Sequence, residues 1–338
     1  MKRAFIIPTW EGHFDKNITF LESCIEYDVK VPVKIVVSNE SERISLRSMV
    51  EKINYYENLN LEIIEIEKVI SKFKPEINLS DIENLKLIHQ RVPTIFHPKH
   101  PYQAIKKIYA LRYFDYDQAM LLDSECAFVK PTDADELFDE YFNNPQIFYT
   151  PHKNLHPNLR MFTDASQQCL RWTDVGLVKD MWVFENLYWM VDKKIFNDML
   201  NDIESNLGVD IYTEFITNSG EIFDMITYYS YIHINNEKYN YQFIDFYSTI
   251  KKYLGDSFNN YFSSKANRLG GALEFMFENV NKDNYEDIFN FINDYKIRFC
   301  RPDFCDLILY KSAVKNSPYL NMILASEKST ELINFLKR

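Results

Sequence analysis

The chain has 338 residues, of which 46% are hydrophobic and 26% charged, a globular composition that excludes wholesale disorder. Its formal net charge of −11 makes nucleic acid an unfavourable partner, because an acidic surface repels phosphate backbones. No stretch approaches the ~18 apolar residues of a membrane span, and the five scattered cysteines fit free thiols. We therefore expect a cytoplasmic protein without a membrane span. Peripheral association with a membrane and the oligomeric state stay open.

Short apolar runs and amphipathic stretches alternate from the N-terminus to about residue 70. Apolar runs at 4–7, 31–37 and 61–66 predict strands, and periodic apolar faces at 17–27 and 44–56 predict helices between them. Strands that alternate with helices form a parallel sheet covered by helices. The sequence therefore predicts an α/β fold.

The same alternation continues to about residue 142. Residues 102–114 predict a helix, residues 118–122 a buried strand, and residues 133–142 a helix with an acidic first turn, as the helix dipole favours. A strand at 182–191 and a helix at 193–203 follow, and the tail from Tyr285 is predicted mostly helical. We expect three parts: 1–150, 151–260 and a helical region, 261–338, packed on the core.

Two acidic residues, Asp123 and Glu125, follow the apolar run of the buried strand. In an open parallel sheet, ligands bind beyond the carboxyl ends of the strands. If the chain is still extended there, both acids point to one side and Ser124 faces away. Two hard oxygen ligands on one side suit Mg²⁺ or Mn²⁺ that also binds a diphosphate. The alternative is that the acids cap the strand end by accepting hydrogen bonds from loop amides.

Three blocks carry a family resemblance: residues 5–9 (Phe-Ile-Ile-Pro-Thr), residues 36–40 (Val-Val-Ser-Asn-Glu), and residues 103–131. In the third block a helix leads to an apolar strand, an Asp-x-Asp-like Asp-Ser-Glu, and then Phe and Pro. With these blocks the segment 1–150 is similar to the GT-A class of glycosyltransferases, especially bacterial members that build capsule or lipooligosaccharide glycans. The resemblance implies a GT-A-like, mostly parallel sheet flanked by helices, with a helical C-terminal region.

By position, the resemblance also implies a donor site with these contacts: Pro8 and Thr9 beside the nucleobase, Ser38 or Asn39 at the base or ribose, Lys106 or Lys107 at the phosphates, Asp123 at the ribose and metal, and Glu125 as a metal ligand. Glu125 stands where Asp is usual, which leaves open the identity of the ion, Mn²⁺ or Mg²⁺, and whether it is obligatory. The lysines have a solvated helix face as their alternative, and Asn39 is a common turn residue.

Candidates for the acceptor half come from the second half of the chain. Asp224 and Glu221 are three residues apart, hence on one face if this segment is helical. Either would serve as catalytic base in an inverting reaction, whereas a retaining reaction needs none; an exposed pair is the alternative. His233 is a candidate third metal ligand, although a lone His between isoleucines is typical of a packed residue. Candidates for stacking on an acceptor sugar, with core packing as the alternative, are Trp172, Trp182 and Trp189.

These features predict a metal-dependent glycosyltransferase that moves a sugar from a nucleotide-sugar donor to a glycan acceptor, in surface polysaccharide biosynthesis. Two alternatives stay open. One is a non-catalytic nucleotide- or glycan-binding module, and the other is a nucleotidyltransferase or nucleotide-sugar hydrolase on the same scaffold. The first loop, residues 8–14, has one Gly and no Lys or Arg, which argues against a nucleotidyltransferase.

Overall fold

The computed structural model describes residues 1–76, 100–151, 181–182, 189–208, 210–212, 224–255, 282–300 and 307–324. In these ranges the strands are β1 (Arg3–Pro8), β2 (Val33–Val37), β3 (Leu61–Glu65), β4 (Gln118–Leu121), β5 (Cys126–Phe128), β6 (Gln146–Pro151), β7 (Met181–Trp182), β8 (Trp189–Asp192), β9 (Gln242–Asp245), β10 (Phe299–Cys300) and β11 (Met322–Leu324). The α-helices are α1 (Phe14–Glu26), α2 (Glu40–Val50), α3 (Ile66–Phe73), α5 (His100–Tyr113), α6 (Ala134–Asn143), α8 (Lys193–Leu207), α10 (Asp224–Ile234), α11 (Asn236–Tyr239), α12 (Phe246–Leu254), α15 (Tyr285–Asp294) and α16 (Leu307–Asn316).

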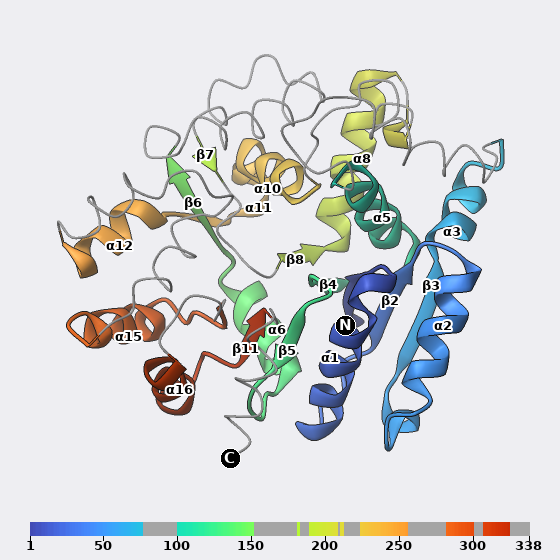
Figure 1. Cartoon of the computed structure of the whole chain (residues 1–338). Coiled ribbons are helices and arrows are strands. Elements are labelled where there is room, and N and C mark those ends of the chain that lie inside the picture. Colours follow the sequence, from blue (N-terminus) through green and yellow to red (C-terminus); the bar gives the residue numbers. More distant parts are fainter. Residues whose placement is uncertain are drawn as a thin grey trace.

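A five-stranded sheet forms the centre of the molecule, in the order β3-β2-β1-β4-β8 (Figure 1). The first four strands are parallel, and β8 runs antiparallel to β4. The register pairs Phe5 of β1 with Val33 on one side and Met120 on the other. The predicted α/β fold with a mostly parallel sheet is therefore confirmed.

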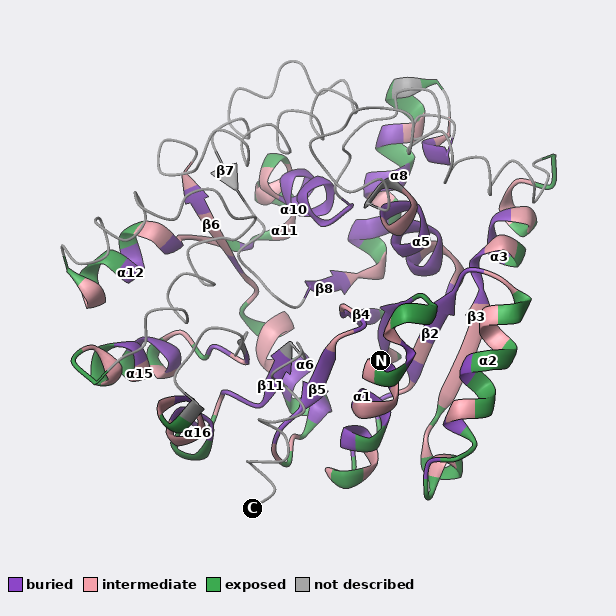
Figure 2. Ribbon diagram, in the orientation of Figure 1, coloured by how far each residue is buried: buried purple, intermediate pink, exposed green. Residues whose placement is uncertain are grey.

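Helices cover both faces of this sheet, so β1 is apolar on both sides, as expected for a strand in a buried parallel sheet. Ala4 and Ile6 belong to the core cluster formed with α3, α5, α8 and α10. Phe5 and Ile7 belong to the cluster formed with α1, α2 and α6. Residues 4–8 of β1 are all buried, and Figure 2 shows β8 as mostly buried and α2 with exposed residues along its length. The sheet is therefore the middle layer of three, with helices on either side.

Two predicted elements differ from the structure. The helix predicted at 44–56 begins at Glu40, because Asn39 caps it by accepting a hydrogen bond from the amide of Glu42, and it ends at Val50. The strand predicted at 182–191 corresponds to β7 and β8, which belong to different sheets. An apolar run alone does not reveal such a division.

The C-terminal region contributes strands as well as helices. β11 pairs antiparallel with β5, which follows the acidic residues after β4, and parallel with β10. α12, α15 and α16 pack on this sheet in a third core cluster. The sequence predicted a mostly helical tail from Tyr285, which agrees with α15 and α16, but it did not predict β10 and β11, which have only two or three residues each and so display no alternation. In the ranges described, no helix combines the length and the apolarity that crossing a lipid bilayer requires.

Candidate functional site

The carboxyl ends of β1, β2 and β4 meet at one edge of the central sheet, because the three strands are parallel and in register. Thr9, Ser38 and Asp123 come directly after these strands or one residue later. The chain builds outward from β1 to β3 and then crosses to β4 on the other side of β1. In α/β sheets, this reversal of strand order is where ligands bind. The strand order therefore predicts a ligand site at the carboxyl ends of β1 and β4.

Two lysines of α5 point to this edge, and both are buried. The ammonium of Lys106 donates to the backbone oxygen of Thr9 at 2.6 Å and to Oγ of Ser38 at 3.1 Å. Lys107 and Lys106 are only 5% and 3% exposed, so the alternative of a solvated helix face is wrong. Lys106 joins the ends of β1 and β2, which makes it part of the frame of the site.

Lys107 lies between two carboxylates that are far apart in the sequence. Its Nζ is 3.7 Å from Oδ1 of Asp123 and 3.6 Å from Oδ2 of Asp224. The indole of Trp189 lies beneath it, with 4.2 Å between Nζ and a ring centroid. Trp189 is 2% exposed, so core packing describes its position and stacking on an acceptor does not.

Asp224 is the first residue of α10, where the helix dipole favours a negative charge. It is 5% exposed, and its Oδ2 has no hydrogen-bond partner among the residues that the structure describes. Burial raises the pKa of this carboxyl, while the nearby Lys107 opposes the rise. The alternative of an exposed acidic residue is wrong for Asp224. Glu221, its predicted companion, lies outside the described residues.

The chain turns after Asp123 and is not extended. Ser124 and Glu125 form a turn, closed by a 3.3 Å hydrogen bond from the amide of Cys126 to the oxygen of Asp123. The expected strand-like alternation is therefore wrong, and Ser124 does not face away from the site. Its hydroxyl is 2.7 Å from Nδ1 of His13.

Glu125 contacts the first helical segment of the chain. Its carboxylate is paired with Lys16 and lies 3.4 Å from Nε2 of His13. Asn17, fully buried, accepts a 2.5 Å hydrogen bond from the hydroxyl of Thr9 and donates to the oxygen of Ser124 at 3.1 Å. Sequence reasoning missed His13, Lys16 and Asn17. Their position in the sequence could have identified them, because these polar residues lie at the start of the helix that follows the first strand.

Asp123 and Glu125 could hold a divalent cation together with ligands that the described residues do not supply. Within the described ranges, no group of three or more His, Cys, Asp or Glu side chains is arranged to hold a metal ion. Mg²⁺ is commonly bound by one or two carboxylates together with waters and substrate phosphates, so a pair of acids suffices chemically. An ion there would share these carboxylates with Lys107 and Lys16.

His233 stands apart from these acids. It is nine residues after Asp224 on α10, which corresponds to about 13 Å along the helix axis. Its ring meets Phe243 edge-on, with centroids 4.6 Å apart, and burial lowers its pKa. The structure does not bring His233 together with Asp123 and Glu125, so nothing there supports it as a third ligand.

The remaining predicted donor contacts are also engaged within the chain. Pro8 is a buried residue of β1, paired with Val36 of β2. Asn39 caps α2 by accepting from the amide of Glu42, and Glu42 Oε2 accepts a 2.6 Å hydrogen bond from the amide of Ser38, the residue before the cap. Asn39 is thus a helix cap rather than a turn residue. Trp172 lies outside the described residues, and the side chain of Trp182 is not described.

Comparisons with known proteins give distant similarities only. No family model matches the chain, and no curated protein matches it in sequence. Among solved structures, the apo form of mouse xyloside xylosyltransferase 1 is 8% identical with a TM-score of 0.40, over 80% of this chain and 96% of that one. Core-mannan synthase A from Aspergillus fumigatus, in a Mn/GDP form, is 14% identical with a TM-score of 0.37, over 68% of each chain. S. aureus TarS is 13% identical with a TM-score of 0.35, over all of this chain and 53% of that one. Identities and scores this low do not by themselves establish a shared fold or activity.

Proposed function

We propose that the chain is a glycosyltransferase that moves a sugar from a nucleotide-sugar donor to a glycan acceptor. The observation that carries the proposal is the buried ammonium of Lys107, within 4 Å of both Asp123 and Asp224, at the strand edge where α/β sheets bind ligands. A buried cation can stabilise the departing diphosphate, and a buried carboxylate can serve as the base of an inverting reaction. The resemblance of the segment 1–150 to GT-A enzymes supports the same reaction.

The chemistry follows from the charges. As the glycosidic bond to the donor breaks, negative charge grows on the departing diphosphate and positive charge on the sugar ring. Lys107 would stabilise the diphosphate, and removing one such preorganised group typically costs about 10²–10³-fold in rate. A divalent ion held by Asp123 and Glu125 would add Lewis-acid stabilisation of the same leaving group. If the reaction inverts the anomeric centre, Asp224 would take the proton of the acceptor hydroxyl.

Two rival functions predict different outcomes in one experiment. The thermal shift produced by nucleoside diphosphates is measured with and without Mn²⁺, and released nucleotide is then measured with nucleotide-sugars and an acceptor panel. A transferase releases nucleotide faster when its acceptor is present, whereas a hydrolase releases it equally without acceptor. A binding module stabilises on nucleotide but never releases product. No stabilisation by any nucleotide would contradict the proposal.

The Lys107→Met variant links the activity to this site. We expect transfer to fall by at least about 10²-fold, because the ammonium facing the diphosphate is lost. Lys251→Met, which changes an exposed lysine of α12, serves as the matched control and should keep the wild-type rate. Equal rates for the two variants would remove Lys107 from the mechanism. Surface polysaccharide biosynthesis in the cytoplasm remains the expected context.

A further inference from the structure

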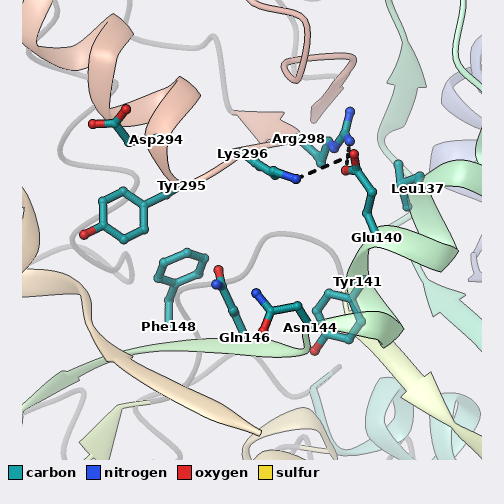
Figure 3. A pocket seen from close by; sticks show the side chains of 10 residues that line it. All are labelled: Leu137, Glu140, Tyr141, Asn144, Gln146, Phe148, Asp294, Tyr295, Lys296 and Arg298. Atoms are coloured by element: carbon teal, nitrogen blue, oxygen red, sulfur yellow. Dashed lines mark hydrogen bonds and ion pairs between the residues drawn. The ribbon is translucent and has the colours of Figure 1, made fainter.

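A pocket of about 270 Å³ lies between α6, β6 and the turn that follows α15. Its lining residues are Leu137, Glu140, Tyr141, Asn144, Gln146, Phe148, Asp294, Tyr295, Lys296 and Arg298. Figure 3 shows residues 294–298 on one side of the pocket, opposite residues 144–148 on the other. Its volume is slightly below the ~300–1,000 Å³ of pockets for drug-sized ligands, so it suits a small ligand such as a single sugar ring.

This pocket is distinct from the strand-end site. Arg3, at the start of β1, donates to Asp135 at 2.7 Å and is paired with Asp139, both on α6. The helix that lines the pocket is therefore anchored at the amino edge of the sheet. Thr9 marks the carboxyl edge, and the length of β1 separates the two edges by roughly 20 Å.

The pocket offers aromatic rings to its ligand. Tyr295 and Phe148 are both half-buried, and their ring centroids lie 6.1 Å apart at an interplanar angle of 69°. The two rings therefore form an angled apolar wall, not a flat stack. Aromatic walls combined with a few polar groups are typical of small-molecule sites, and the C–H faces of a pyranose pack well on such rings.

The charges of the pocket are balanced within the chain. Glu140 is paired with Arg298, and Nζ of Lys296 lies 3.8 Å from the same carboxylate. Asp294 accepts a 2.7 Å hydrogen bond from the hydroxyl of Tyr253. Two acids thus face two bases, and an anionic ligand would have to compete with Glu140 for its cations. The balance favours a neutral ligand.

Two side-chain amides are oriented by a neighbour outside the pocket. Gln242 donates to Oδ1 of Asn144 at 2.9 Å and accepts from Nε2 of Gln146 at 3.4 Å. This arrangement leaves the Asn144 amide nitrogen as a donor and the Gln146 amide oxygen as an acceptor for a ligand. Adjacent hydroxyls of a sugar ring, each both donor and acceptor, match such a pair.

We propose that this pocket is a binding subsite for one neutral sugar ring of a glycan, separate from the strand-end site. The combination of an angled aromatic wall, balanced charge and an oriented donor–acceptor amide pair carries the assignment. It does not depend on catalysis, so it stands or falls independently of the proposed transferase activity.

The test measures binding of methyl glycosides of neutral hexoses and N-acetylhexosamines to the full chain by saturation-transfer NMR. We expect saturable binding by at least one of them, on the order of millimolar affinity. Gln146→Ala should weaken it about 2–10-fold, as for one lost hydrogen bond, and Tyr295→Ala about 10-fold through loss of the aromatic wall. Tyr55→Ala, an exposed tyrosine outside the pocket, is the matched control and should bind as the wild type does.

Gln146→Ala also guards against a folding artefact, because it removes a half-buried polar side chain and leaves the aromatic cluster intact. The Asp123→Asn variant should bind these glycosides as the wild type does, since it alters only the strand-end site. Three outcomes would overturn the proposal: no glycoside saturates the protein, both pocket variants bind normally, or binding is lost in Asp123→Asn alone.

Discussion

At the scale of single residues, the site consists of charges balanced against one another. Lys107 is shared by Asp123 and Asp224, and Lys16 is paired with Glu125. A buried charge without a partner would be costly in free energy, so each charged group is stabilised by its oppositely charged neighbour. A ligand that carries phosphates or a cation would exchange these internal partners for its own.

Glu125 tests the metal interpretation. We expect Glu125→Ala to abolish transfer at every Mn²⁺ concentration, because one of two oxygen ligands is lost. The carboxylate is 26% exposed, so its loss should change the free energy of unfolding by about 1 kcal/mol or less. Activity is measured against Mn²⁺ concentration, with Glu286→Ala, on the exposed side of α15, as control. Wild-type turnover by Glu125→Ala would end the metal-site argument.

Asp224 predicts a pH dependence if the reaction inverts. Because burial raises its pKa, Asp224 becomes protonated at a higher pH than an ordinary aspartate does. A protonated carboxyl cannot accept the acceptor's proton, so kcat should fall as pH decreases through that raised pKa. Asp224→Asn should lower kcat at least ~10²-fold and abolish this acid limb.

The control for that measurement is Asp287→Asn, which changes an exposed acid on α15 and should leave the pH profile unaltered. If Asp224→Asn keeps both the rate and the acid limb, the base must be sought elsewhere, with Glu221 as the next candidate.

At the scale of elements, the cap of helix α2 matters both for the stability of the fold and for the donor site. Asn39 is that cap, and it is also a predicted contact of the nucleotide-sugar donor. Asn39→Ala removes the cap of α2 and should lower the free energy of unfolding by about 1 kcal/mol. Asp133→Ala removes the equivalent cap of α6, a 3.0 Å bond from the amide of Glu136, and should cost a similar amount. Urea denaturation checks both. Nucleotide affinity should fall in Asn39→Ala only, if Asn39 also contacts the donor; equal affinities would restrict Asn39 to capping.

At the scale of the whole molecule, a late segment of the chain packs beside the candidate site. Strand β11 pairs with β5, the strand that follows the turn at Ser124 and Glu125. Met322 of β11 is fully buried and belongs to the same core cluster as Phe5 of β1. Met322→Ala should therefore lower the free energy of unfolding by about 2–5 kcal/mol in a single transition. Ile44→Ala, 57% exposed on α2, should change it by no more than about 0.5 kcal/mol. Two separate transitions, with only one affected, would show that the C-terminal region folds on its own.

The sequence by itself determined the alternation of strands and helices in the N-terminal half and the acids after β4. These features are local. The apolar period of a segment depends on which of its own side chains meet the core, so the period can be recognised from consecutive residues. The two lysines of α5 were also identified from the sequence, although their burial was not.

The tertiary structure alone decided which of these groups meet. Lys107, Asp123 and Asp224 come from three parts of the chain, and no periodicity relates them. The same holds for His13 and Lys16 against Glu125, and for β11 against β5. Such contacts depend on how the layers pack, since each joins segments that lie far apart in the sequence.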